Sequence, residues 1–160
     1  MTTGGFSSKQ LLLEETVLRL PALNNADAVE IGEIATTLGN QRNLPITIEV
    51  RIGDRMVFHA SLKGSKPEHN WWINRKAAVV MLKQHSTMYE RVSAEERGVD
   101  WHSENNLPDE TYAIHGGAIP LITNEGFKGI LIISGLPQVD DHLFAVEVLT
   151  EFLARKGEEI

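Results

Sequence analysis

The chain contains no cysteine among its 160 residues. Disulfide bonds, thiolate nucleophiles and zinc or iron–sulfur sites with cysteine ligands are therefore excluded. Hydrophobic residues make up 42% of the chain and charged residues 23%, which is the composition of an ordinary globular protein. Since this length is enough to bury a substantial core, we expect one domain over residues 1–160.

Long apolar segments are also missing. No run approaches the roughly 18 apolar residues that a membrane-spanning helix needs. Residues 1–8 have neither the basic start nor the apolar centre of a signal peptide. We therefore expect a cytoplasmic protein that does not enter a membrane.

Positive charge is scarce in the second half of the chain. The net charge is −7, and residues 81–160 contain six Lys and Arg against fourteen Asp and Glu. A nucleic-acid backbone is bound by a basic surface. Nucleic acid is therefore not an expected partner.

Local catalytic and metal-binding motifs are absent from the sequence. The six histidines form no His-x-x-x-His pair and no Glu-x-x-His pair. There is no glycine-rich phosphate loop, nucleophile elbow or dinucleotide fingerprint. A metal or catalytic site would have to be assembled from distant segments, for example from His115, Asp141 and His142.

The hydrophobic periodicity predicts helices and strands in a definite order. Helices are expected over residues 9–20, 24–43, 68–85, 88–97 and 137–155, and strands over residues 46–52, 56–62, 112–123 and 126–134. The order ααββα(α)ββα is typical of an α/β (α+β) protein in which helices flank an antiparallel sheet. The strand at 130–133 is apolar throughout, which indicates a central strand covered on both faces.

The register of the first predicted hairpin can be tested against its apolar pattern. A two-residue turn pairs Ile48 with His59 and so mixes the two faces, whereas a three-residue turn over 53–55 pairs Ile48 with Ala60. The second choice puts the apolar residues on one face and is preferred. It also places His59 opposite Glu49.

The helix predicted over 68–85 has apolar side chains around almost its whole circumference. Such a helix is buried on more than one side. Since a domain of this size seldom hides a helix completely, one apolar face is expected to pack on a second subunit.

Four segments together point to a known family. They are Asn-Trp-Trp-Ile-Asn-Arg-Lys at 70–76, Lys-Gln-His-Ser at 83–86, Ala-Ile-His-Gly-Gly-Ala-Ile-Pro at 113–120, and Ser-Gly-Leu-Pro-Gln-Val-Asp-Asp-His at 134–142. In this order and spacing the chain resembles the haem-degrading, GlcG/HbpS-like family, in its short cytosolic branch. The resemblance covers about residues 15–155.

The resemblance implies a three-layer sandwich, a homo-oligomer built from dimers, and haem as a cofactor, because some relatives bind or degrade haem. Three functions remain open: a protein that binds a tetrapyrrole or haem, a non-enzymatic adaptor for protein partners, and an enzyme for a small anionic metabolite. The candidate ligand-binding residues are Arg75, His85, His115, Gly116, Gly117, Ser134, Asp141 and His142.

The His115-Gly116-Gly117 triplet falls inside a predicted strand. Two adjacent glycines weaken a strand, so a bulge or the close approach of a ligand or another backbone must explain them. His115 is either a core histidine or part of a ligand pocket, and both interpretations remain open.

Arg75 falls on an apolar stripe of its helix. A buried guanidinium needs a carboxylate, which belongs either to a structural ion pair or to a bound anion. Lys76 is expected on a solvated edge.

The remaining candidates lie at helix ends. His85 suits a helix C-terminus, where it caps carbonyl groups. His142 lies in the first turn of the last helix and is expected to be neutral. The N-cap of this helix is expected to be Asp140 or Asp141. The turn after Ser134 leads into this helix N-terminus, where backbone N–H groups can hold an anion.

Overall fold

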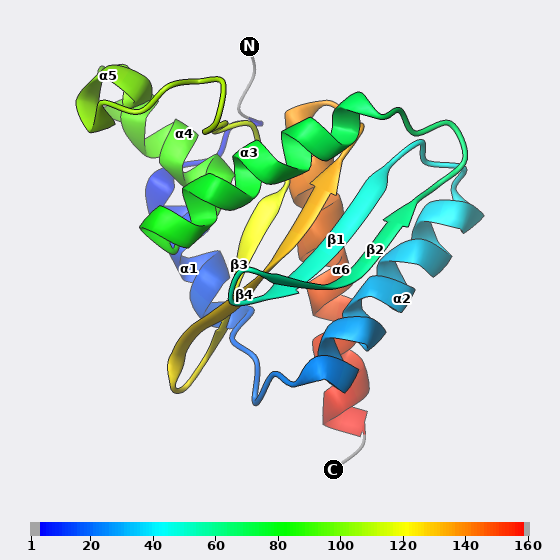
Figure 1. Cartoon of the computed structure of the whole chain (residues 1–160). Helices are drawn as coiled ribbons and strands as arrows, with labels where there is room; N and C mark the ends of the chain where they lie inside the picture. Colours follow the sequence, from blue (N-terminus) through cyan, green and yellow to red (C-terminus); the bar gives the residue numbers. More distant parts are fainter. Residues whose placement is uncertain (1–3, 159–160) are drawn as a thin grey trace.

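The computed structural model describes residues 4–158, which form a four-stranded antiparallel sheet between two layers of helices (Figure 1). The helices are α1 (Ser8–Val17), α2 (Asn25–Gln41), α3 (Glu68–Lys83), α4 (Thr87–Glu96), α5 (Trp101–Asn105) and α6 (Gln138–Glu158). The strands are β1 (Thr47–Ile52), β2 (Arg55–Ser61), β3 (Ala118–Thr123) and β4 (Gly126–Ser134), in the spatial order β2-β1-β4-β3. The predicted fold class and three-layer arrangement are confirmed.

The two faces of the sheet carry different side chains. Ile48, Val50, Leu131 and Ile133 face α2 and α6 in the main core. Ile130 and Ile132, on the other face of β4, pack under α3. The expectation that β4 is a central strand covered on both faces is therefore confirmed. Figure 1 shows α3 crossing one face and α2 and α6 lying on the other.

The first hairpin confirms the predicted register but not the predicted turn. Ile48 pairs with Ala60, and Glu49 with His59, as expected. However, Ile52 pairs with Arg55, so the turn has two residues. A β-bulge after Val50 adds one residue on β2 and realigns the apolar side chains. The periodicity indicated the offset between strands but could not show where the extra residue lies.

The second hairpin is shorter than predicted, because β3 begins at Ala118 rather than near Tyr112. Residues 112–117 run towards α3, where the Ala113 N–H donates to the Arg75 carbonyl at 3.1 Å. The prediction that His115-Gly116-Gly117 lies inside a strand is therefore wrong. The triplet forms the approach to β3.

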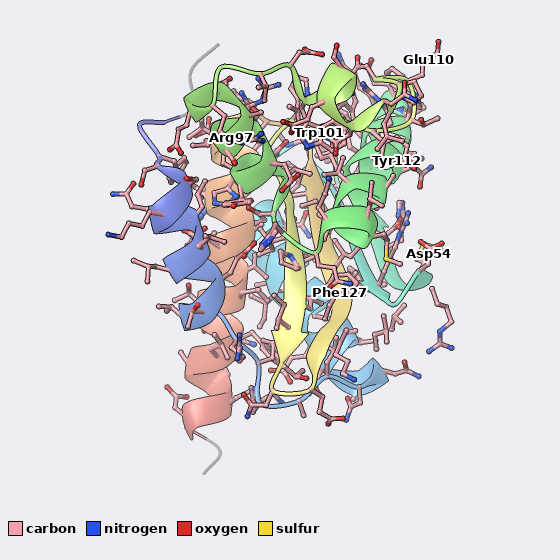
Figure 2. The ribbon with its side chains drawn as sticks, turned by 90° about the vertical axis from the view of Figure 1, so that its left-hand side faces the viewer. Asp54, Arg97, Trp101, Glu110, Tyr112 and Phe127 are labelled. Atoms are coloured by element: carbon pink, nitrogen blue, oxygen red, sulfur yellow. The ribbon has the colours of Figure 1, made fainter. Side chains whose placement is uncertain are left out.

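The acidic segment after α4 contains a helix that the sequence did not indicate. Asp100 caps α5 by accepting from the Ser103 N–H, and Trp101 is buried with its indole N–H donating to Glu90 at 2.9 Å. Figure 2 places Trp101 beside α4 and Glu110 at the outer end of the following segment. Five residues were too few for a helical pattern in the sequence.

Helix α3 is buried on two sides, as its apolar circumference predicts. Ile73, Ala77 and Val80 face the sheet, and Val79 packs against Trp101. Trp71 and Leu82 keep about half of their surface exposed, 51% and 52%. They are available for the second-subunit contact, which stays a prediction. Among residues 4–158 no helix is long and apolar enough to cross a bilayer.

The last helix begins within one residue of its predicted start at residue 137. Gln138 is the first residue of α6, so Asp140 and Asp141 lie in its first turn and neither is the N-cap. Asp141 instead accepts from the Leu136 N–H at 3.0 Å, upstream of the helix. The predicted N-cap is therefore wrong. The Asp141 carboxylate therefore points into the protein, where it is buried.

Gly32 of α2 packs against Phe58 of β2. A Cβ atom at this position would collide with the Phe58 ring. We predict that Gly32→Ala lowers the free energy of unfolding by about 1–3 kcal/mol, because overpacking outweighs the gain in helix propensity. Gly157→Ala, which meets nothing within 4 Å, should be neutral or stabilising by up to about 1 kcal/mol. Urea denaturation measures both, and equal effects would contradict the packing.

Candidate functional site

A cavity of about 250 Å³ lies where α3, the approach to β3, the end of β4 and the start of α6 meet. Its lining consists of Glu68, His69, Trp72, Lys76, His115, Ser134, Gly135, Leu136, Gln138 and Asp141. A second hollow of about 560 Å³ shares four of these residues, Trp72, His115, Leu136 and Gln138, and extends past Pro137 and Val139. His115 therefore lies on the wall common to two adjoining spaces.

A buried ion pair forms part of the first cavity. The Lys76 ammonium donates to the Asp141 carboxylate at 3.2 Å and to the Ile133 carbonyl at 2.9 Å. Both side chains are 2% exposed. Lys76 comes from α3 and Asp141 from α6, so the pair joins the two helical layers past the end of the sheet. The expectation that Lys76 lies on a solvated edge is wrong.

Burial acts on the two partners in opposite directions. It lowers the pKa of Lys76 below its ordinary value, against the pull of Asp141. Burial also raises the pKa of Asp141 to about 6, against the pull of Lys76 and of hydrogen bonds from the Leu136 and Gly135 backbone. Both shifts favour the neutral forms. The energetic gap between the ion pair and the neutral amine–acid pair is therefore narrowed.

Gly117 makes room for this pair, and Gly116 makes room for the first residue of α6. A Cβ at Gly117 would collide with the Ile133 carbonyl and lie 2.7 Å from the Lys76 ammonium, and φ at Gly117 is +133°. A Cβ at Gly116 would lie 2.5 Å from the Gln138 carbonyl. The expected close approach is therefore made by other parts of the protein. The Gly116 N–H also donates to the Gln138 side chain at 3.2 Å.

His115 stands edge-on to Trp72, with ring centroids 4.6 Å apart. Burial, together with the nearby cations Arg91, Lys76 and Arg75, lowers the pKa of His115 to about 4. Asp109 acts in the opposite direction, and the imidazole is neutral at pH 7. Its Nδ1 is buried and has no hydrogen-bond partner among residues 4–158.

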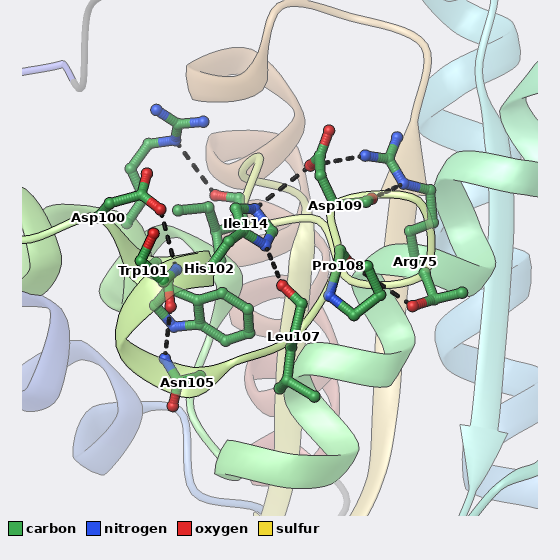
Figure 3. Close-up of polar contacts among 12 residues, drawn as sticks. Arg75, Asp100, Trp101, His102, Asn105, Leu107, Pro108, Asp109 and Ile114 are labelled. Carbon is green, nitrogen blue, oxygen red and sulfur yellow. Dashed lines mark hydrogen bonds and ion pairs between the residues drawn. The ribbon is translucent and has the colours of Figure 1, made fainter.

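Arg75 lies beside the cavity lining rather than in it. Its guanidinium donates to the Asp109 carboxylate at 2.8 Å and to the Asp109 carbonyl at 2.7 Å (Figure 3). It also stacks on Trp71 and Trp72, 4.1 and 4.4 Å from the ring centroids. The expected carboxylate partner is confirmed and belongs to a structural ion pair. Arg75 therefore reaches the cavity only through Trp72.

Two predicted site histidines lie elsewhere. His85 bonds Glu15 at 2.8 Å, which raises the pKa of His85 above its ordinary value. His142 is fully buried and bonds Glu14 at 2.8 Å. Both histidines therefore fasten α1 to the rest of the fold. Within the described residues no three His, Asp or Glu side chains form a metal-binding group, so the set of His115, Asp141 and His142 is not assembled.

Of the predicted site residues, the structure brings together His115, Ser134 and Asp141 in the cavity, with Gly116 and Gly117 directly behind it. The sequence reasoning missed Lys76, Trp72, Gln138, Glu68 and His69. Lys76 could have been suspected, because it follows Arg75 within the shared motif. Gln138 gave no signal, since its role is a bond to a backbone group 22 residues away.

Comparisons with known proteins agree with this fold. Residues 23–150 match the family described as "Haem degrading protein HbpS-like". The chain therefore belongs to the HbpS-like family of haem-degrading proteins. A UPF0303 protein of Streptomyces avermitilis is 35% identical over 147 residues, covering 91% of this chain and 90% of the relative. A UPF0303 protein of Schizosaccharomyces pombe is 30% identical, covering 91% and 83%.

Solved structures show the same fold. The crystal structure of the Ybr137w protein has a TM-score of 0.84 at 25% identity, covering 92% of this chain and 88% of that chain. The crystal structure of a PduOC:Heme complex has a TM-score of 0.65 at 16% identity, covering 79% and 94%. At that identity the second likeness shows the fold alone.

Breaking the buried pair should be costly. We predict that Lys76→Met lowers the free energy of unfolding by about 3 kcal/mol, because Asp141 then lacks its cation. The double variant Lys76→Met/Asp141→Asn should lose less than the sum of the single variants. Arg155→Gln removes an exposed ion pair and should cost less than about 1 kcal/mol. Urea denaturation measures the free energy of unfolding of each variant. A loss in Lys76→Met no larger than that in Arg155→Gln would contradict the burial of the pair.

The two histidines should titrate on opposite sides of the ordinary value. His115 should titrate with a pKa of about 4 and His85 with a pKa above 6.5. Neutral His115 thus contributes stability above pH 6.5 that is lost as pH falls through about 4. The His85–Glu15 bond contributes stability below pH 6.5 that is lost as pH rises through the folded pKa of His85. Histidine ring NMR measures both, and an unshifted His115 would contradict its environment.

Proposed function

We propose that this HbpS-like protein binds a small ligand carrying a carboxylate, with tetrapyrroles as the first class to consider. The observation that carries the proposal is neutral His115, close to three cations and on the wall shared by two hollows. With no acceptor for Nδ1 among the described residues, the imidazole proton is assigned to Nε2, because an orphaned N–H is rarer than an orphaned lone pair. Nε2–H can then donate to a carboxylate.

The larger hollow suits the ring of such a ligand. Trp72, Leu136, Pro137 and Val139 provide apolar surface, and a planar aromatic ring packs well against an indole. The volume of about 560 Å³ lies within the usual range of ligand pockets. A propionate at the His115 end would point towards the smaller, polar cavity.

Haem itself fits the site only in part. The apolar hollow and His115 suit the porphyrin ring and its carboxylates. Axial ligation of iron is less well supported, because a ligating histidine almost always donates its other N–H to an acceptor, and His115 Nδ1 has none among residues 4–158. The proposal therefore assigns recognition to the organic part of the ligand and derives no chemistry from the iron.

A titration with hemin and with metal-free protoporphyrin tests this proposal. We expect the two dissociation constants to agree within about threefold, because the ring and carboxylates supply the contacts. His115→Ala should weaken both by about 5- to 10-fold, the value of one hydrogen bond. His85→Ala, which removes a histidine outside the cavity, should leave both unchanged.

Two results would contradict the proposal. Binding of neither compound would exclude tetrapyrroles as the ligand class. Hemin binding much tighter than protoporphyrin, with a Soret band that depends on His115, would show that iron ligation carries the affinity instead.

A further inference from the structure

Lys76 is the one amine among the described residues that line the smaller cavity. Its position is unusual for a lysine, because the side chain is 2% exposed and lysines are almost never fully buried. Replacing a buried ion pair with apolar side chains is often neutral or stabilising. Stability alone therefore does not explain why Lys76 and Asp141 lie against a cavity. A chemical role would explain it.

The surroundings of Lys76 favour a nucleophilic amine. The buried ammonium loses part of its hydration, which makes the neutral amine easier to form than on the surface. Asp141, 3.2 Å away, can take the proton and hold it as a neutral carboxylic acid. The Ile133 carbonyl, 2.9 Å from the Lys76 nitrogen, fixes the position of the amine. The Lys76–Asp141 pair thus has the parts of an amine nucleophile with its own acid and base.

We propose that Lys76 condenses with a small aldehyde or ketone that carries a carboxylate, forming an imine in the cavity. The cavity of about 250 Å³ admits a compound of a few carbon atoms. His115, on the same wall, would receive the carboxylate, and this part of the inference rests on the proposed function. The amine chemistry of Lys76 does not depend on it.

The reaction needs no oxidant or reductant. The Lys76 nitrogen lone pair attacks the carbonyl carbon, a C–N bond forms, and the carbonyl oxygen takes the proton held by Asp141. The Asp141 carboxylate then accepts a proton from the nitrogen and returns it to the hydroxyl group. The C–O bond breaks, the C=N bond forms, and one water molecule leaves. Amine and carbonyl compound have become imine and water.

Reductive trapping tests the inference with the wild-type protein. The protein is incubated at pH 7 with glyoxylate and cyanoborohydride, and the modified lysines are mapped by mass spectrometry. We expect Lys76 to gain a carboxymethyl group at least tenfold faster than Lys63, an exposed lysine. Labelling of Lys63 but not of Lys76 would overturn the inference.

Two variants separate reactivity from folding. Asp141→Asn keeps the shape of the side chain but removes the acid and base, and should slow labelling of Lys76 by about tenfold or more at unchanged Lys63 labelling. Lys76→Arg keeps the charge. It should remove the fast labelling that belongs to Lys76 and leave the labelling rate of Lys63 unchanged. Unchanged Lys76 labelling in Asp141→Asn would refute the role of Asp141.

The two proposals can fail independently. Carboxylate recognition is tested by His115→Ala, which should slow trapping of glyoxylate but not of formaldehyde, a carbonyl compound without a carboxylate. Equal slowing of both would remove His115 from the inference and leave Lys76 in it. A failed tetrapyrrole titration has no bearing on trapping at Lys76.

Discussion

The buried pair of Lys76 and Asp141 is the constraint around which this end of the molecule is organised. It holds α3 and α6 together near the end of β4, where the Ile133 carbonyl also accepts a hydrogen bond from Lys76. Any side chain at Gly117 would enter the same space. A glycine at 117 therefore leaves space for two buried charges and for the close polar partners that each charge needs.

Adjacent cations on α3 have separate roles. Arg75 is bound by Asp109 and stacked on two tryptophans, whereas Lys76 faces the cavity with Asp141. Both cations lower the pKa of His115, although burial contributes most. The cavity wall thus combines a neutral imidazole with a nearby cation that is paired with a carboxylate. Of these two neighbouring cations, Arg75 is held in an ion pair beside the cavity and Lys76 lines it.

Period-two and helical patterns were sufficient to predict an antiparallel sheet with helices packed on it, the strand pairing of Ile48 with Ala60 and the two-sided burial of β4. They failed where a single residue decides the geometry. The bulge in β2 depends on local backbone conformation, and the depth of Lys76 depends on Asp141, 65 residues away. Arg75 was expected to need a carboxylate, but only the folded chain could show that Asp109 supplies it. His85 and His142 were predicted to be site residues because the sequence could not show their real partners. These are acids of α1 that lie 70 and 128 positions away.

Lys76 is a buried amine at the wall of a cavity, and burial disfavours its ionised form. The most direct test is a titration of the Lys76 side chain followed by NMR of the Cε carbon, with Lys63 as the exposed reference in the same spectra. The structure predicts a pKa for Lys76 below the ordinary 10.5 and a second inflection when Asp141 titrates. A pKa at or above the ordinary value, with no response to Asp141, would contradict the account.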